Sequence, residues 1–128
     1  MSYLRFQTNI RCENTGRWIG IFSAAGELRD NDRIEPWFAE PLRETLQWFN
    51  TNLKVPNAEQ VKKRCLFWFD CNSPDVLGAV WDLVTLLQQH DINVISKKCA
   101  DPGKILYRDC HQVAAIPSQR IYRVLGRN

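Results

Sequence analysis

The stretch 64-RCLFWFDCNSPDVLGAVWDLVTLLQQH-90 carries the two strongest secondary-structure signals of the chain. Residues 64–71 are apolar on both faces of a strand. The alternating side chains are Cys65, Phe67 and Phe69 on one side and Leu66 and Trp68 on the other. Strands without a polar face are usually central in their sheet. The sequence therefore predicts a central strand at this position.

The second half of this stretch predicts a helix. Ser73 is a favourable cap, Pro74 suits the first helical position and the charge of Asp75 suits the helix dipole. The periodicity continues to about His90, with an apolar face of Val76, Leu77, Val80, Leu83, Val84 and Leu87. A further strand follows at residues 92–96. The two strands should therefore be parallel, either paired directly or with one strand between them.

Upstream, residues 3–12 alternate apolar and polar side chains, which predicts a half-buried strand. Its buried side is Leu4, Phe6, Thr8, Ile10 and Cys12, and Arg5, Gln7, Asn9 and Arg11 lie on the solvent side. Two helices are expected next. Residues 20–30 place Phe22, Ala25 and Leu28 at helical spacing. A helix beginning at Glu40 and Pro41 aligns Leu42, Leu46, Phe49 and Leu53 on one stripe, which Phe38 would extend, with Trp48 at its edge.

Downstream, residues 104–108 and 111–116 read as a strand hairpin. The expected fold class is α+β, with the element order β-α-α-β-α-β-β-β. We expect a mixed, mostly antiparallel sheet of about five strands, with the helices mainly on one face. Residues 1–117 are expected to form a single domain, and residues 118–128 a basic C-terminal tail.

Composition and the apolar stretches indicate the cellular compartment of the protein. The 128 residues carry a net charge of +3 and five cysteines, an odd number that does not suit a disulfide framework. The N-terminus lacks the apolar core of a signal peptide, and the longest apolar stretch contains Asp82 and is too short for a bilayer. A cytoplasmic protein without a membrane partner is therefore expected.

The segment 99-CADPGKILYRDCHQVAAIP-117 concentrates reactive residue types, yet its spacing matches no known kind of site. There is no C-x₂-C pair, and the adjacent Cys110 and His111 would point to opposite faces of a strand. Nucleophile elbows and phosphate-binding glycine loops are also missing from the chain. Asp70 and Asp109 are expected to accept hydrogen bonds from backbone amides in turns. We therefore predict no metal site, no cofactor and no catalytic residue.

Several segments resemble a family of small bacterial hypothetical proteins of similar length, for which no activity is known. The resembling segments are YLRFQT, TGRWIGIFSAAGELRD, LQWFNTNL, LFWF and the final DPGKILYRDCHQVAAIP hairpin. The resemblance implies a bacterial or phage-related origin and a domain that ends near Pro117. It implies no site residues.

By elimination, the sequence favours a non-catalytic module that binds a protein partner. Two surfaces are candidates, the polar row Arg5, Gln7, Asn9 and Arg11 and the aromatic region of Trp18, Trp37 and Trp48, because tryptophans are frequent interface anchors.

Two alternatives remain open at this point. One is nucleic-acid binding by the sheet face and the basic tail, with bases stacking on Tyr3, Trp68 or Tyr107 and phosphates held by Arg5 and Arg11. Residues 97–128 carry seven Lys or Arg and two Asp, against ten Lys or Arg and twelve acidic residues before them. The other alternative is a small enzyme of unrecognised type, whose pocket would gather Asp70, Asp109, His111 or a cysteine. The sequence identifies neither the partner nor the oligomeric state.

Overall fold

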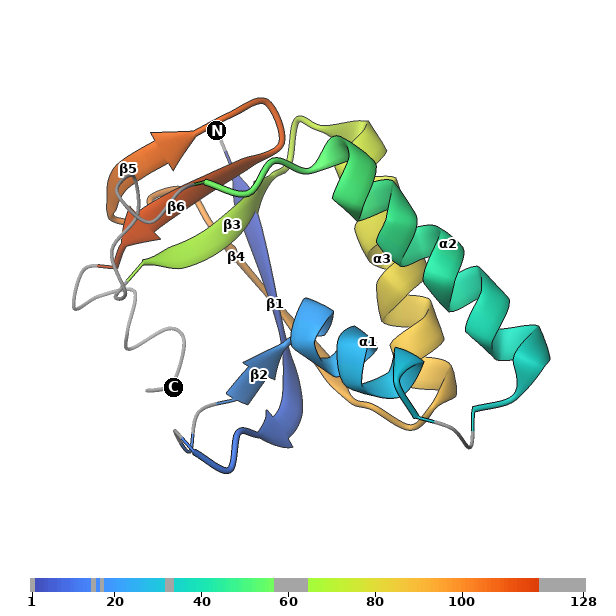
Figure 1. Ribbon diagram of the computed structural model, residues 1–128. Coiled ribbons are helices and arrows are strands. Elements are labelled where there is room, and N and C mark those ends of the chain that lie inside the picture. The colour runs from blue at the N-terminus through green and yellow to red at the C-terminus, as the bar shows by residue number, and fades with distance from the viewer. Residues whose placement is uncertain (1, 15, 17, 32–33, 57–64, 118–128) are drawn as a thin grey trace. The chain divides into compact units, whose positions relative to one another are not determined.

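The computed structural model describes residues 2–14, 16, 18–31, 34–56 and 65–117 (Figure 1). Within these residues the chain forms six strands and three helices, in the order β1, β2, α1, α2, β3, α3, β4, β5, β6. The predicted α+β class and the predicted succession of elements are confirmed. One element was not predicted, the three-residue strand β2 (Trp18–Gly20). The predicted tail, residues 118–128, lies outside the described residues, so the domain boundary near Pro117 stays a prediction.

The residues gather into two compact units. The first comprises Met1–Arg5, Lys54–Leu77 and Ser96–Asn128, and the second comprises Phe6–Leu53 and Gly78–Ile95. Strand β1 (Tyr3–Arg11) and helix α3 (Pro74–Gln89) each contribute residues to both units.

Antiparallel strands build the first unit. Strand β3 (Leu66–Asp70) pairs with β6 (Gln112–Ile116) on one side and with the start of β1 on the other, and β6 also pairs with β5 (Lys104–Arg108). Figure 1 shows the β5–β6 hairpin in orange and red. The prediction that β3 is central in its sheet is confirmed. Strand β4 (Val94–Cys99) pairs with β1, so β3 and β4 each have β1 as a neighbour, as the second of the two expected arrangements requires.

The second unit is built around α1 (Ile21–Arg29) and α2 (Pro36–Asn52), together with the part of α3 from Gly78 onward. Helices α1 and α2 contact each other, and the rings of Phe22 and Phe49 meet edge-on at 4.9 Å between centroids. The buried apolar side chains of this unit are Phe6, Ile21, Ala24, Ala25, Phe38, Ala39, Leu42, Leu46, Phe49, Val80, Leu83, Val84 and Leu87. The predicted apolar stripes of α2 and α3 therefore form its core.

Two details of the helices differ from expectation. Helix α2 begins at Pro36 rather than at Glu40 and Pro41, so Pro36 occupies the first-turn position and Pro41 lies inside the helix. Burial of Phe38 accounts for the extra turn, because the apolar stripe of α2 begins there. In α1 the buried stripe starts from Ile21, and Phe22 is 38% exposed. The buried face of this nine-residue helix is therefore shifted by about one residue from the expected one.

Candidate functional site

The polar row of β1 faces solvent over only part of its length. Asn9 and Arg11 are exposed, as expected, but Gln7 is buried and Arg5 is half-buried. The expectation of one continuous wet face is therefore wrong at Gln7. In the first unit, the same side of β1 starts with Tyr3, which is buried in an apolar cluster with Trp68 and Val113. The alternating pattern of β1 carries no sign of this cluster, because the partner side chains belong to distant strands.

Two of the expected base-stacking side chains are buried in the same cluster and are not accessible to a nucleotide. Tyr3 is 2% exposed and Trp68 is 1% exposed, so neither ring offers a face to a nucleotide. The phenol of Tyr3 also accepts a hydrogen bond of 3.0 Å from the Arg108 guanidinium. Tyr107 is half-buried, and its hydroxyl is engaged with Asp109. The aromatic groups proposed for nucleic-acid binding are thus mostly committed to other contacts.

Trp18 lies in β2, where it pairs with Arg11 of β1. The Arg11 guanidinium lies over the Trp18 ring, 4.1 Å from its centroid, and donates a hydrogen bond of 2.6 Å to the carbonyl oxygen of Gly16. This stack of a cation on an aromatic ring closes the β1–β2 turn. Trp18 therefore has a local structural contact and is half-buried.

Trp37 and Trp48 lie on a single exposed stripe of α2. They are eleven positions apart, which is close to three full helical turns and places them within about 20° of each other around the axis and about 16 Å apart along it. Trp37 is 71% exposed and Trp48 is half-buried. The buried residues Leu42 and Leu46 occupy the opposite side of the helix. We call Trp37, Glu40, Pro41, Glu44 and Trp48 the α2 stripe.

Each of these indoles is held by the buried phenylalanine that follows it. Trp37 meets Phe38 edge-on at 5.9 Å between ring centroids, and Trp48 meets Phe49 edge-on at 5.3 Å. Such edge-to-face pairs are favourable and restrict the orientation of the exposed ring. The two tryptophans therefore stand on the surface with less rotational freedom to lose when a partner binds.

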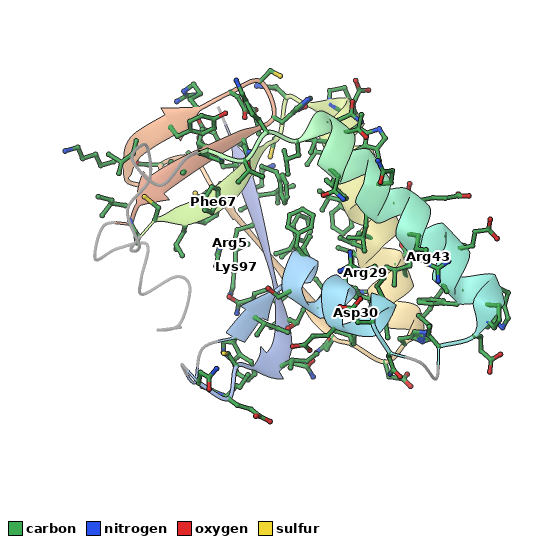
Figure 2. All side chains as sticks on the ribbon, in the orientation of Figure 1. Arg5, Arg29, Asp30, Arg43, Phe67 and Lys97 are labelled. Carbon is green, nitrogen blue, oxygen red and sulfur yellow. The ribbon has the colours of Figure 1, made fainter. Side chains whose placement is uncertain are left out.

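The α2 stripe is acidic between its two tryptophans. Glu40 and Glu44 are exposed and lie on the stripe, and Arg43 is offset by about a third of a turn from Trp37. Arg29 and Asp30, labelled in Figure 2, form an ion pair of 3.1 Å at the end of α1. The stripe thus combines two aromatic anchors with two carboxylates. The two tryptophans were among the predicted site residues and the two glutamates were not, although the eleven-residue spacing places the glutamates between them.

A hydrogen-bond network closes the β5–β6 hairpin around Asp109. Its carboxylate accepts hydrogen bonds from the backbone N–H of His111 at 2.8 Å, from the backbone N–H of Gln112 at 2.9 Å and from the hydroxyl of Tyr107 at 2.8 Å. Burial alone would raise the pKa of Asp109, but these hydrogen bonds together lower it below its ordinary value. The pKa of Tyr107 is raised, mainly by the hydrogen bond to Asp109. The expectation that Asp109 is a turn residue is confirmed.

Asp70 and His111 connect the hairpin to the start of α3. The carboxylate of Asp70 accepts a hydrogen bond of 2.8 Å from the N–H of Asn72, as expected for a turn carboxylate. The hydroxyl of Ser73 and the Nδ1 of His111 are hydrogen-bonded at 2.7 Å. A serine and a histidine at this distance resemble half of a nucleophilic pair. Ser73 is only 7% exposed, however, so the geometry is that of a structural link between α3 and the hairpin.

Metal ligation and membrane insertion find no support in the described part of the chain. All five cysteines are free thiols. Among the residues that the structure describes, no group of three or more His, Cys, Asp or Glu side chains is placed to hold a metal ion. No helix in that part of the chain has both the length and the apolar character needed to cross a bilayer.

Comparisons of the chain with protein-family models, curated proteins and solved structures gave no match. The family resemblance noted from the sequence therefore stays a prediction.

Proposed function

We propose that this protein is a cytoplasmic, non-catalytic binding module whose partner is a protein that docks on the α2 stripe. The observation that carries the proposal is Trp37, which is 71% exposed on a helix whose opposite face is fully buried. Large aromatic side chains are costly to expose to water, and tryptophan is the residue most enriched among the energetic centres of protein interfaces.

The chemistry of the stripe defines the partner further. Glu40 and Glu44 lie between the two tryptophans, so a complementary surface carries lysine or arginine side chains. A guanidinium or ammonium group of the partner would meet a carboxylate, and its apolar neighbours would meet an indole face. Five free thiols support the proposed cytoplasmic location, because unpaired cysteines persist in reducing compartments.

The test is affinity capture of the tagged full-length protein from its host, with and without nuclease, using three forms of the protein. The wild type is compared with Trp37→Ser and with Asn50→Ala, a matched exposed position on the same helix but off the stripe. Loss of an interface tryptophan should cost at least about 2 kcal/mol, or roughly thirtyfold in Kd. The partner should therefore survive nuclease, be lost with Trp37→Ser and be retained with Asn50→Ala.

Three other results would contradict parts of this proposal. A partner that Trp37→Ser retains at wild-type affinity would place the interface elsewhere. Recovery of bound material only without nuclease would favour nucleic-acid binding. Binding that does not weaken at high salt would contradict the inferred basic character of the partner, because exposed charge pairs are screened by salt.

A further inference from the structure

Arg5 of the first unit is a half-buried cation with few partners among the described residues. Its Nη1 donates a long hydrogen bond of 3.3 Å to the carbonyl oxygen of Phe67, and its Nε is buried with no acceptor. Burial lowers the pKa of Arg5. No carboxylate of the described residues forms an ion pair with it. Buried polar groups in proteins are normally hydrogen-bonded, so this Nε–H needs an acceptor that the described residues do not supply.

A second buried donor lies beside Arg5. The β1–β3 register pairs Tyr3 with Asp70 and Leu4 with Phe69, and its continuation sets Arg5 opposite Trp68. Residues opposite each other in an antiparallel pair share one face of the sheet. The indole Nε1–H of Trp68 is also buried and has no hydrogen-bond partner. Two unsatisfied N–H groups on adjacent strands thus lie on the same face of the sheet.

A second positive charge comes from β4. The N–H of Asn9 donates to the carbonyl oxygen of Asn93 at 3.1 Å, which fixes how β4 lies along β1. Counting from this bond in opposite directions along the two antiparallel strands places Lys97 beside Arg5. Figure 2 shows the two labelled side chains together. Both residues are half-buried, so each keeps part of its surface in contact with solvent.

We propose that Arg5, Trp68 and Lys97 form a binding site for an oxyanion, the phosphate or carboxylate group of a small ligand. Guanidinium, ammonium and indole groups are donors only, so none of the three can satisfy another. An oxyanion accepts from all of them and neutralises the local charge, and such charge-assisted hydrogen bonds are the strong ones. The site shares no residue with the α2 stripe, and the two proposals stand or fall independently.

The test follows the Trp68 indole N–H by NMR in the ¹⁵N-labelled full-length protein, with its signal assigned through Trp68→Phe. Sodium phosphate and sodium acetate are titrated separately against sodium chloride at constant ionic strength. At least one oxyanion should shift the Trp68 signal saturably, and chloride should not. The anion that saturates at the lower concentration identifies whether the ligand group is a phosphate or a carboxylate.

Three variants distinguish oxyanion binding at this site from a non-specific effect of anions on the surface charge. Arg5→Gln should abolish the saturable shift, and Lys97→Gln should weaken the affinity several-fold without disturbing a buried group. Lys98→Gln is the matched control, because Lys98 is exposed and points to the opposite face of β4. A linear shift in the wild type, or the same titration curve for Lys97→Gln and Lys98→Gln, would overturn the proposal.

Discussion

Gly103, in the connection between β4 and β5, is a position where the first unit accepts no side chain. Its φ is +106°, a conformation that residues with a Cβ rarely adopt. Its N–H donates a hydrogen bond of 3.0 Å to the carboxylate of Asp101, which fixes the turn. A Cβ built at Gly103 would overlap the backbone carbonyl of Ile116 and come within 3.0 Å of the Cα of Pro117. Gly103→Ala must therefore change the turn or push it away from the end of β6.

The expected loss of stability can be estimated from these two effects. A non-glycine residue at a strained positive φ costs on the order of 1–3 kcal/mol. Moving the turn away from Ile116 sacrifices at least one hydrogen bond near the Lys104–Ile116 pair, which is worth about 1 kcal/mol. Together these give about 3 kcal/mol. For a chain of this size, 1 kcal/mol moves Tm by roughly 3–5 °C, so we expect a decrease of about 10 °C.

The assay is thermal and urea unfolding followed by circular dichroism, with Gly78→Ala as the control. Gly78 lies inside α3, and a Cβ there would meet nothing within 4 Å. The control should be more stable than the wild type by about 0.5–1 kcal/mol, because alanine favours helix more than glycine does. If Gly103→Ala melts within about 2 °C of the wild type, the packing of this turn against β6 is wrong.

Three further predictions address the hairpin network, the α2 stripe and the core. Because the pKa of Asp109 is lowered in the folded protein, its contribution to stability is complete above about pH 4 and is lost as the pH falls through the folded value. In urea unfolding, Asp109→Asn should therefore lose less stability than the wild type as the pH falls below about 4. The same substitution should lower the pKa of Tyr107, measured by spectrophotometric titration. Trp37→Ser should leave the free energy of unfolding within about 0.5 kcal/mol of the wild type, because the side chain is 71% exposed. Leu42→Ala, at a fully buried position of the same helix, should reduce it by roughly 2–5 kcal/mol.

The sequence predicted those elements whose signals are local. The periodicity of α3 and the doubly apolar β3 depend on neighbouring residues. Helix α3 ends within about one residue of its expected limit, and β3 lies within two residues of its expected limits. The α2 start was misplaced because Pro36 and Pro41 offer the same signal, and only burial of Phe38 decides between them. The three residues of β2 are too few to show an alternation.

The surfaces were less predictable than the elements, because exposure depends on residues distant in the chain. The alternation in β1 is real, but Tyr3 is buried by Trp68 and Val113, which lie 65 or more positions away. The hydrogen bond between Ser73 and His111 joins residues 38 positions apart. The exposure of Trp37 could have been predicted from the helical phase of Leu42 and Leu46, had the helix been started at Pro36.

Substitution of Arg5 should affect the stability of the fold and the binding of an oxyanion in opposite directions. A partly buried cation that lacks a counter-ion opposes folding, and apolar residues of similar volume in place of buried charges are often neutral or stabilising. Arg5→Met should therefore raise the free energy of unfolding by about 1 kcal/mol in chloride buffer, since the hydrogen bond to Phe67 that it loses is long, at 3.3 Å.

In phosphate or acetate the wild type should instead be more stable than Arg5→Met. A ligand that binds only the folded state stabilises the wild type in proportion to RT ln(1 + [L]/Kd), and Arg5→Met forfeits that gain. Unfolding curves of both proteins in chloride and in each oxyanion measure the two effects independently. A variant that is less stable than the wild type by the same amount in every buffer would show that Arg5 serves the fold. A crossover between buffers would show that the charge is retained for its ligand, at a cost in the stability of the unliganded chain.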